Sequence, residues 1–168
     1  TGFREVAAAY QQADPSDRVA WVGPSMSARS SITARQMETW AHAQAIADEL
    51  GIERSEDDRI RNIVVLGVNT FGWSFMVRGM EVPEGPPALH LTSPSGESWE
   101  YGNPESDQVI RGMAHEFAQV VTQTRNIADT QLVCEGDIAE LWMRNAQCFA
   151  GAATEPPAPG VRRTKSSA

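Results

Sequence analysis

Basic residues are scarce in this sequence of 168 residues: 14 Lys and Arg stand against 22 Asp and Glu, a formal net charge of −8. Such a charge repels a phosphate backbone, so we expect no nucleic-acid partner. Long hydrophobic runs are missing too, because none approaches the roughly 20 residues that span a bilayer. The opening letters TGFREVAAAY lack the charged-then-apolar order of a signal peptide. We therefore expect a cytoplasmic protein that makes no membrane contact.

Cysteine is almost absent as well. Cys134 and Cys148 are too few and too far apart for a disulfide framework or a zinc knuckle, so reduced structural thiols are expected. The sequence has no glycine-rich phosphate loop, which leaves a nucleotide-binding role without support. What remains is an ordinary globular composition, 41% hydrophobic and 21% charged, long enough for one domain or two small ones.

Helical spacing of apolar residues dominates the first half of the chain. It predicts a helix over 2–12, a long helix over about 30–50 that ends before Gly51, and a third helical pattern over 60–75. The segment EVPEGPP (residues 81–87) then changes the character of the sequence. We place a domain boundary there, dividing the chain into residues 1–82 and 83–152, with a Pro-rich, then basic, flexible tail at 153–168.

The second predicted domain mixes short strands with helices. Two strand-like runs, 88–92 and 98–101, flank good turn residues, and 109–111 is a candidate third strand. Helical spacing returns over about 113–122 and 137–149, where Asp137 is expected to cap the last helix. The predicted fold class is α+β.

Glu38 and His42 are the most informative polar pair. They lie four residues apart on the long predicted helix, so one ion could touch both side chains. Carboxylate oxygen and imidazole nitrogen suit zinc and related divalent metals, and a catalytic site needs three protein ligands. By spacing alone, a solvated helix face with an ordinary contact is the simpler explanation of the pair.

The other two histidines give weaker signals. His90 alternates with Leu89 and Leu91 in a short strand, which predicts that it faces solvent. His115 and Glu116 look like the start of a zinc-protease motif, but Gln119 stands where that motif requires its second histidine. We name no further acid or base.

Two strings carry a family resemblance: GPSMSARS (residues 23–30) and ARQMETWAHAQ (residues 34–44). They resemble the DinB-like proteins grouped with the mycothiol-dependent maleylpyruvate isomerases, more narrowly an actinobacterial metal-binding branch labelled wyosine-base-formation domain-like. The likeness continues through LGV (66–68), VRG (77–79) and the letters AQCFAG (146–151). It implies the C-terminal helices of a DinB-like bundle followed by a small sterol-carrier-like α/β domain.

The resemblance also implies a metal site and a reaction class. In the family, one histidine from an early helix and the Glu and His of an E-x-x-x-H helix hold the metal. Glu38 and His42 match the later pair, while the early histidine has no counterpart, since His90 and His115 lie downstream. Because Thr1 is not a methionine and a helical pattern opens the chain, we expect a missing N-terminal segment or a companion chain to supply the third ligand.

The resulting hypothesis is a metal-dependent enzyme, with a divalent metal such as zinc, that uses a low-molecular-weight thiol like mycothiol. The metal would lower the pKa of the thiol, and the resulting thiolate would add to a small electrophile. The electrophile would then be isomerised, or the thiol would be transferred to it. The alternative is a non-catalytic module, with or without metal, that binds a small ligand or a partner. A homodimer is compatible with either hypothesis.

Overall fold

The computed structural model describes residues 2–20 and 25–162, and the fold within these ranges is mixed α+β, as the sequence predicts. Thr1, residues 21–24 and residues 163–168 lie outside the described residues. The N-terminal elements are α1 (Gly2–Gln12), β1 (Arg18–Val19), β2 (Met26–Ser27) and α2 (Ala28–Leu50). No helix within the described ranges is both long enough and apolar enough to cross a membrane.

The long helix α2 has clear start and stop signals. The Ser27 hydroxyl accepts a hydrogen bond from the Ser30 backbone N–H at 3.1 Å, which satisfies one of the free donors of the first turn. Gly51 ends the helix with φ of 65°, a left-handed conformation that glycine adopts without steric cost. Between these ends the sequence has no Pro or Gly, so α2 runs unbroken for 23 residues.

The third helical pattern is not one helix, which corrects the sequence prediction. It divides into η1 (Asp58–Ile60), α3 (Arg61–Asn69) and α4 (Phe71–Met76). The break falls at Thr70, whose hydroxyl donates to the backbone oxygens of Leu66 at 2.8 Å and Gly67 at 3.0 Å. A short β-branched polar side chain that bonds back to the preceding turn competes with helix continuation.

The sheet has the strand order β4-β3-β5-β6, with β3 (Ala88–Thr92) parallel to β5 (Val109–Met113) and the outer strands β4 (Ser98–Tyr101) and β6 (Val133–Glu135) antiparallel to their neighbours. The three strands expected from sequence are confirmed; β6 was not predicted. Leu89, Leu91 and Ile110 are buried on one face, whereas His90 faces the other. This alternation is the period-two signature of a half-buried sheet.

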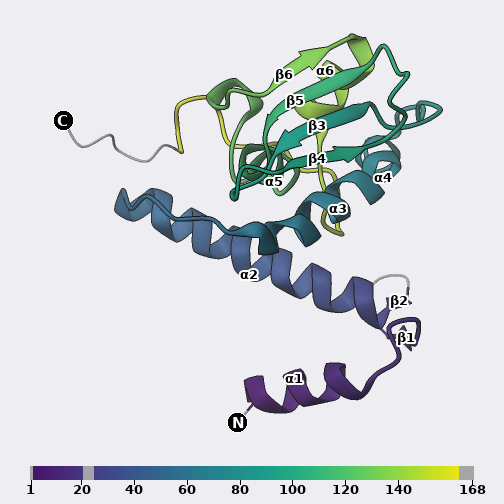
Figure 1. Ribbon diagram of the computed structural model, residues 1–168, viewed down its shortest axis with the longest axis vertical. Coiled ribbons are helices and arrows are strands. Elements are labelled where there is room, and N and C mark those ends of the chain that lie inside the picture. Colours follow the sequence, from purple (N-terminus) through teal and green to yellow (C-terminus); the bar gives the residue numbers. More distant parts are fainter. Residues whose placement is uncertain (1, 21–24, 163–168) are drawn as a thin grey trace.

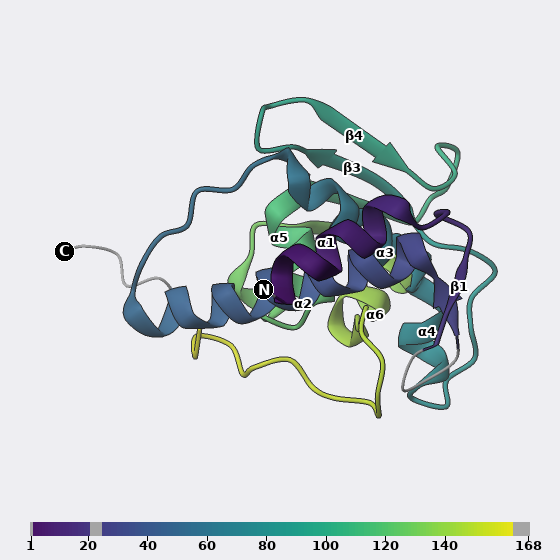
Figure 2. The same cartoon turned by 90° about the horizontal axis from the view of Figure 1, so that it is seen from below.

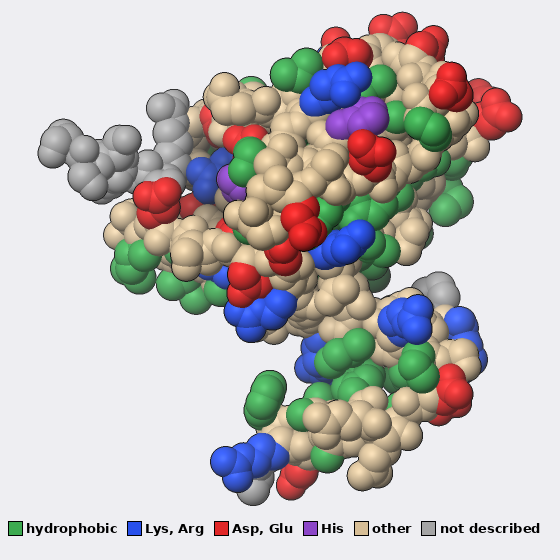
Figure 3. All heavy atoms as spheres, viewed as in Figure 1, with side chains coloured by type: hydrophobic (Ala, Val, Ile, Leu, Met, Phe, Trp, Pro, Cys, Tyr) green, Lys and Arg blue, Asp and Glu red, His purple; other side chains and the backbone are tan. Residues whose placement is uncertain are grey.

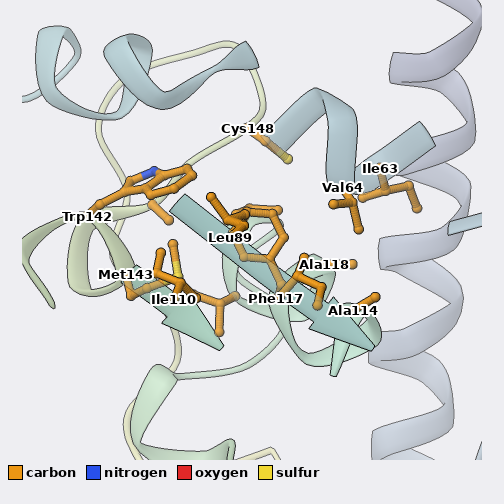
Figure 4. Packing of buried hydrophobic residues seen from close by; sticks show 14 of the residues in the cluster. Ile63, Val64, Leu89, Ile110, Ala114, Phe117, Ala118, Trp142, Met143 and Cys148 are labelled. Carbon is orange, nitrogen blue, oxygen red and sulfur yellow. The ribbon is translucent and has the colours of Figure 1, made fainter. Parts of the chain in front are cut away.

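One hydrophobic core joins the sheet to helices from both halves of the chain. Helices α5 (Ala114–Val121) and α6 (Asp137–Asn145) contribute Phe117 and Trp142, and α3 contributes Ile63 and Val64 (Figure 4). The short helix η2 (Ile127–Asp129) follows α5. Residues on both sides of the predicted boundary at residue 82 thus contribute to one hydrophobic core. An independent second domain stays a prediction.

Two smaller features differ from the sequence prediction or add to it. Gly136 occupies the N-cap of α6 and Asp137 is the first residue of that helix, so Asp137 is not the predicted cap. The described part of the tail, residues 153–162, runs back over the domain: Asn126 donates to the Pro157 oxygen at 3.0 Å, and the Gly160 N–H donates to Asp129 at 2.8 Å. The tail's flexibility stays a prediction.

Candidate functional site

The predicted ligand pair lies on one exposed face of α2. The Nε2 atom of His42 is 3.4 Å from Oε2 of Glu38, and the two side chains are 80% and 52% exposed, respectively. The opposite face of α2 carries the residues that anchor the helix, among them Met37, Trp40 and Gln44. The buried face thus fixes the helix while the Glu38–His42 face stays accessible.

The helix α1 covers only part of α2. Figure 1 shows α1 below α2 and apart from the α/β part, and Figure 2 shows the C-terminal half of α2 extending beyond α1. No residue of α1 is buried, and Phe3 is 85% exposed. The Tyr10 hydroxyl and the Ser31 hydroxyl, 2.6 Å apart, tie the two helices together.

A groove of about 950 Å³ separates α1 from α2 and the segment that follows it. We call it the α1–α2 groove; Phe3, Val6, Ile32, Arg35 and Trp40 are among the residues that line it. Hydrophobic side chains gather on both of its sides (Figure 3). Sequence reasoning did not name this groove, although the amphipathic spacing of α1 was a signal for it.

The donor chemistry of Glu38 and His42 suits a divalent ion, but the pair supplies two donors only. Within residues 2–20 and 25–162, no group of three or more His, Cys, Asp or Glu side chains is arranged to hold a metal ion. His90 lies on the open face of the sheet, 3.7 Å from Glu100, and His115 lies on α5. The structure therefore does not bring either histidine to the pair.

Neither cysteine is suited to nucleophilic chemistry. Burial raises the pKa of Cys134 to about 11, with a smaller contribution from the charge of Glu140. Burial also raises the pKa of Cys148 far above its ordinary value, and the nearby charge of Glu38 adds to that effect. Since the thiolate is the reactive form, the raised pKa values make both side chains poor nucleophiles at neutral pH.

Residues 1–47 match the family model described as the mycothiol maleylpyruvate isomerase N-terminal domain. This match covers α1 and most of α2, with the Glu38–His42 pair inside it. This match agrees with the family that the motifs at residues 23–30 and 34–44 predict.

Two relatives come from Mycobacterium tuberculosis: "Uncharacterized protein MT0041" of strain CDC 1551 / Oshkosh and "Uncharacterized protein Rv0036c" of strain ATCC 25618 / H37Rv. Each is 41% identical over 143 residues, which cover 85% of this chain and 54% of the relative. The chain thus spans about half the length of the curated relatives that it matches. No solved structure matches the chain.

Proposed function

We propose that this chain is part of a cytoplasmic, metal-dependent enzyme that uses a low-molecular-weight thiol of the mycothiol type. Glu38 and His42 are two ligands of its divalent metal, preferably zinc. The observation that carries the proposal is their juxtaposition, 3.4 Å apart and exposed, within the segment that matches the family model. In such a site the bound metal supplies a positive charge that favours the thiolate form of a thiol near it.

The state of the chain's own cysteines favours a thiol supplied from outside the chain as the nucleophile. Cys134 and Cys148 are held protonated by burial, so neither can serve as the nucleophile at neutral pH. Addition of a thiolate to a small electrophile then leads to isomerisation or to transfer, depending on whether the thiol leaves again. In this proposal Glu38 and His42 hold the metal, and their positions do not determine which of the two reactions takes place.

A third ligand completes the site in this proposal. We assign it to a helical segment that precedes this stretch of chain, or to a companion chain, seated along the α1–α2 groove. The groove's apolar walls and the exposure of Phe3 fit an amphipathic helix. Together with α1 and α2 this segment would form a DinB-like bundle, and the sheet with α5 and α6 is the sterol-carrier-like part.

The test measures bound metal and turnover of the electrophile in the same preparations. The protein, with its neighbouring sequence or companion chain present, is dialysed against zinc and its metal content measured by mass spectrometry. The loss of maleylpyruvate and of free mycothiol is then followed, because isomerisation returns the thiol whereas transfer consumes it. We expect one zinc per site, mycothiol-dependent loss of maleylpyruvate, and loss of both zinc and turnover in Glu38→Ala and in His42→Ala.

Glu49→Ala is the matched control, because Glu49 is an exposed carboxylate on the same helix. It should keep the metal and the activity. If both ligand variants retain stoichiometric zinc, the site assignment is wrong.

A second candidate function is a non-catalytic module that binds a small ligand or a partner. The groove of about 950 Å³ favours it, because a groove of that size accommodates a ligand without any metal chemistry. Binding in the α1–α2 groove that Phe3→Ala weakens, with no mycothiol-dependent turnover of the electrophile in any preparation, would favour this alternative.

A further inference from the structure

The helix α2 carries a largely apolar row of side chains along its outward face. Ile32, Ile46 and Leu50 in this row are 39%, 62% and 65% exposed. Members of the row are alternately four and three residues apart, which is the spacing by which two helices pack side by side in a coiled coil. We call the row the α2 seam, and it consists of Ile32, Gln36, Thr39, Ala43, Ile46 and Leu50.

The α2 seam runs through the α1–α2 groove and continues beyond it. Its first four members line the groove. Ile46 and Leu50 lie on the C-terminal half of α2, which extends beyond α1 (Figure 2). A helix laid along the whole seam would therefore fill the groove and also cover these two exposed side chains.

The charges of α2 indicate which helix covers the seam. The first turn holds Arg29 and no acid, and the last turn holds Glu49 and no base, which is the reverse of what the helix dipole favours. Arg35 and Glu49 take part in none of the ion pairs among residues 2–20 and 25–162. An antiparallel copy of the same helix supplies the missing opposite charges, because its acidic end lies beside the basic end of the first.

One register of two antiparallel α2 helices matches the seam to itself. It pairs Ile32 with Leu50, Gln36 with Ile46, and Thr39 with Ala43 of the second copy. Large apolar side chains then close both ends of the contact, and the small Thr39 and Ala43 allow the helices to approach closely in the middle. The single polar member, Gln36, would help to fix the register, as polar residues do in coiled coils.

The same register brings complementary groups together along one flank of the seam. Arg35, His42 and Glu49 are seven residues apart and therefore share this flank. Arg35 then faces Glu49 of the second copy. Because the twofold axis passes between Thr39 and Ala43, His42 lies beside His42 of the second copy.

We propose that two copies of this chain associate through antiparallel α2 seams, and that His42 of the second copy is the third ligand of the metal site. Twofold dimers with self-complementary surfaces are the commonest closed assemblies. One chain offers the two donors of Glu38 and His42, and two copies offer four, which suits one zinc ion per two chains. The shared ligand rests on the proposed function, whereas the pairing of the helices does not.

The test measures molar mass and zinc content, neither of which requires turnover. The 168-residue chain, and the protein with its neighbouring sequence present, are studied by sedimentation equilibrium in a chelator and after dialysis against zinc. We expect twice the mass of one chain under both conditions, and one bound zinc per two chains after dialysis.

Ile46→Glu tests the seam, because it places two unpaired charges within the contact. It should raise the dissociation constant of the dimer by a factor on the order of 100. Ile46 is exposed in the single chain, so the fold does not depend on it. Met76→Glu is the matched control, since Met76 is 58% exposed on α4, away from the seam, and should leave the dimer unchanged.

Charge reversal tests the register. Arg35→Glu and Glu49→Arg should each weaken the dimer about tenfold, because each creates a like-charge pair across the twofold axis. The two changes together restore opposite charges and should restore the dimer. Loss of one exposed charge has little effect by itself, so Glu49→Ala should remain dimeric.

Four results would overturn the proposal. A monomeric 168-residue chain excludes the pairing, and a protein that is monomeric only with its neighbouring sequence present shows that a preceding segment fills the groove. An Ile46→Glu variant that dimerises like the unchanged chain shows that another surface makes the contact. One zinc per chain, lost in Glu38→Ala, excludes the shared ligand and leaves the proposed function standing. A dimer that binds no zinc instead refutes the proposed function and with it the shared ligand.

Discussion

At the residue scale, the buried ion pair of Asp48 and Arg125 distinguishes this molecule from a simple hydrophobic assembly. Oδ1 of Asp48 and Nη2 of Arg125 are 2.8 Å apart, and the side chains are only 3% and 9% exposed. The pair links α2 to the segment after α5. Breaking such a pair leaves an uncompensated charge in a poorly solvated place, which costs far more than losing a surface pair.

We predict that Asp48→Ala lowers the free energy of unfolding by about 3–5 kcal/mol. Glu140→Ala is the comparison, because the Glu140–Arg144 pair is 56% and 60% exposed and such pairs are worth about 0–1 kcal/mol. Urea denaturation measures both. A loss below about 1 kcal/mol for Asp48→Ala, within the range of a surface pair, would contradict the prediction.

The thiol of Cys134 gives a second residue-scale prediction. Burial raises its pKa from 9.0 to about 11, so at pH 8 its thiolate fraction is about a hundredfold below that of an ordinary cysteine. Iodoacetamide should therefore label Cys134 slowly at pH 8, and the labelling rate should rise with pH up to about 11. Because the folded-state pKa is raised, this group also lowers stability as the pH rises from 9 to 11. Labelling at pH 8 at the rate of a free peptide cysteine would refute this assignment.

At the element scale, α3 packs against α5 through a glycine. A Cβ atom on Gly67 would lie 2.9 Å from Cγ2 of Val121 and 3.0 Å from Cε1 of Phe117, closer than such contacts normally occur. Both neighbours belong to the hydrophobic core and have little room to move. The close approach of the two helices thus depends on the missing side chain.

Gly67→Ala should accordingly destabilise the protein by about 1–3 kcal/mol through overpacking, although alanine is the better helix former. Gly72→Ala on α4 is the matched control, since its nearest contact, Cγ1 of Val82, is at 3.4 Å. There we expect no loss of stability in thermal or urea unfolding. Equal effects at the two positions would show that packing against α5 is not the cause.

The elements also show how far sequence reasoning reaches. Periodicity and cap residues were sufficient for α1, α2, β3 and β4, because each has a regular apolar pattern with turn residues at its ends. The break at Thr70 was missed because apolar spacing continues through it, and β6 because a strand of three residues has too short a pattern.

The candidate sites likewise differ in whether local sequence spacing is sufficient to predict them. Glu38 and His42 are four residues apart on one helix, so helical periodicity is sufficient to place their side chains together. The α1–α2 groove could not be located from sequence, because its walls come from α1, α2 and the segment after α2, which only tertiary packing brings together.

At the scale of the whole molecule, the tail connects distant parts of the domain. Thr154 exchanges hydrogen bonds with Gln123, accepting at 2.9 Å and donating at 2.7 Å, and its N–H donates to Gln147 at 3.1 Å. Further along, Asp129 accepts from the Gly160 N–H. From sequence, the proline-rich composition of the tail suggests flexibility. Most of these hydrogen bonds, however, use backbone groups of the tail, and composition does not show where backbone groups find partners.

We predict that ending the chain after Ala152 lowers the melting temperature, because each of these hydrogen bonds contributes about 0.5–1.5 kcal/mol. Ending it after residue 162 removes only the six last residues and serves as the control. Differential scanning calorimetry of the two shortened proteins makes the comparison. Identical melting temperatures would mean that the tail contributes nothing to stability.

The exposed helix α1 has a consequence for how the molecule exchanges hydrogen with solvent. With no buried residue and one side-chain hydrogen bond to α2, its turns can open without disturbing the core. Its amides should exchange with deuterium well before those of α3 or α5. Any segment that settles into the α1–α2 groove must slow that exchange, so the exchange rate of α1 reports directly on what the groove holds.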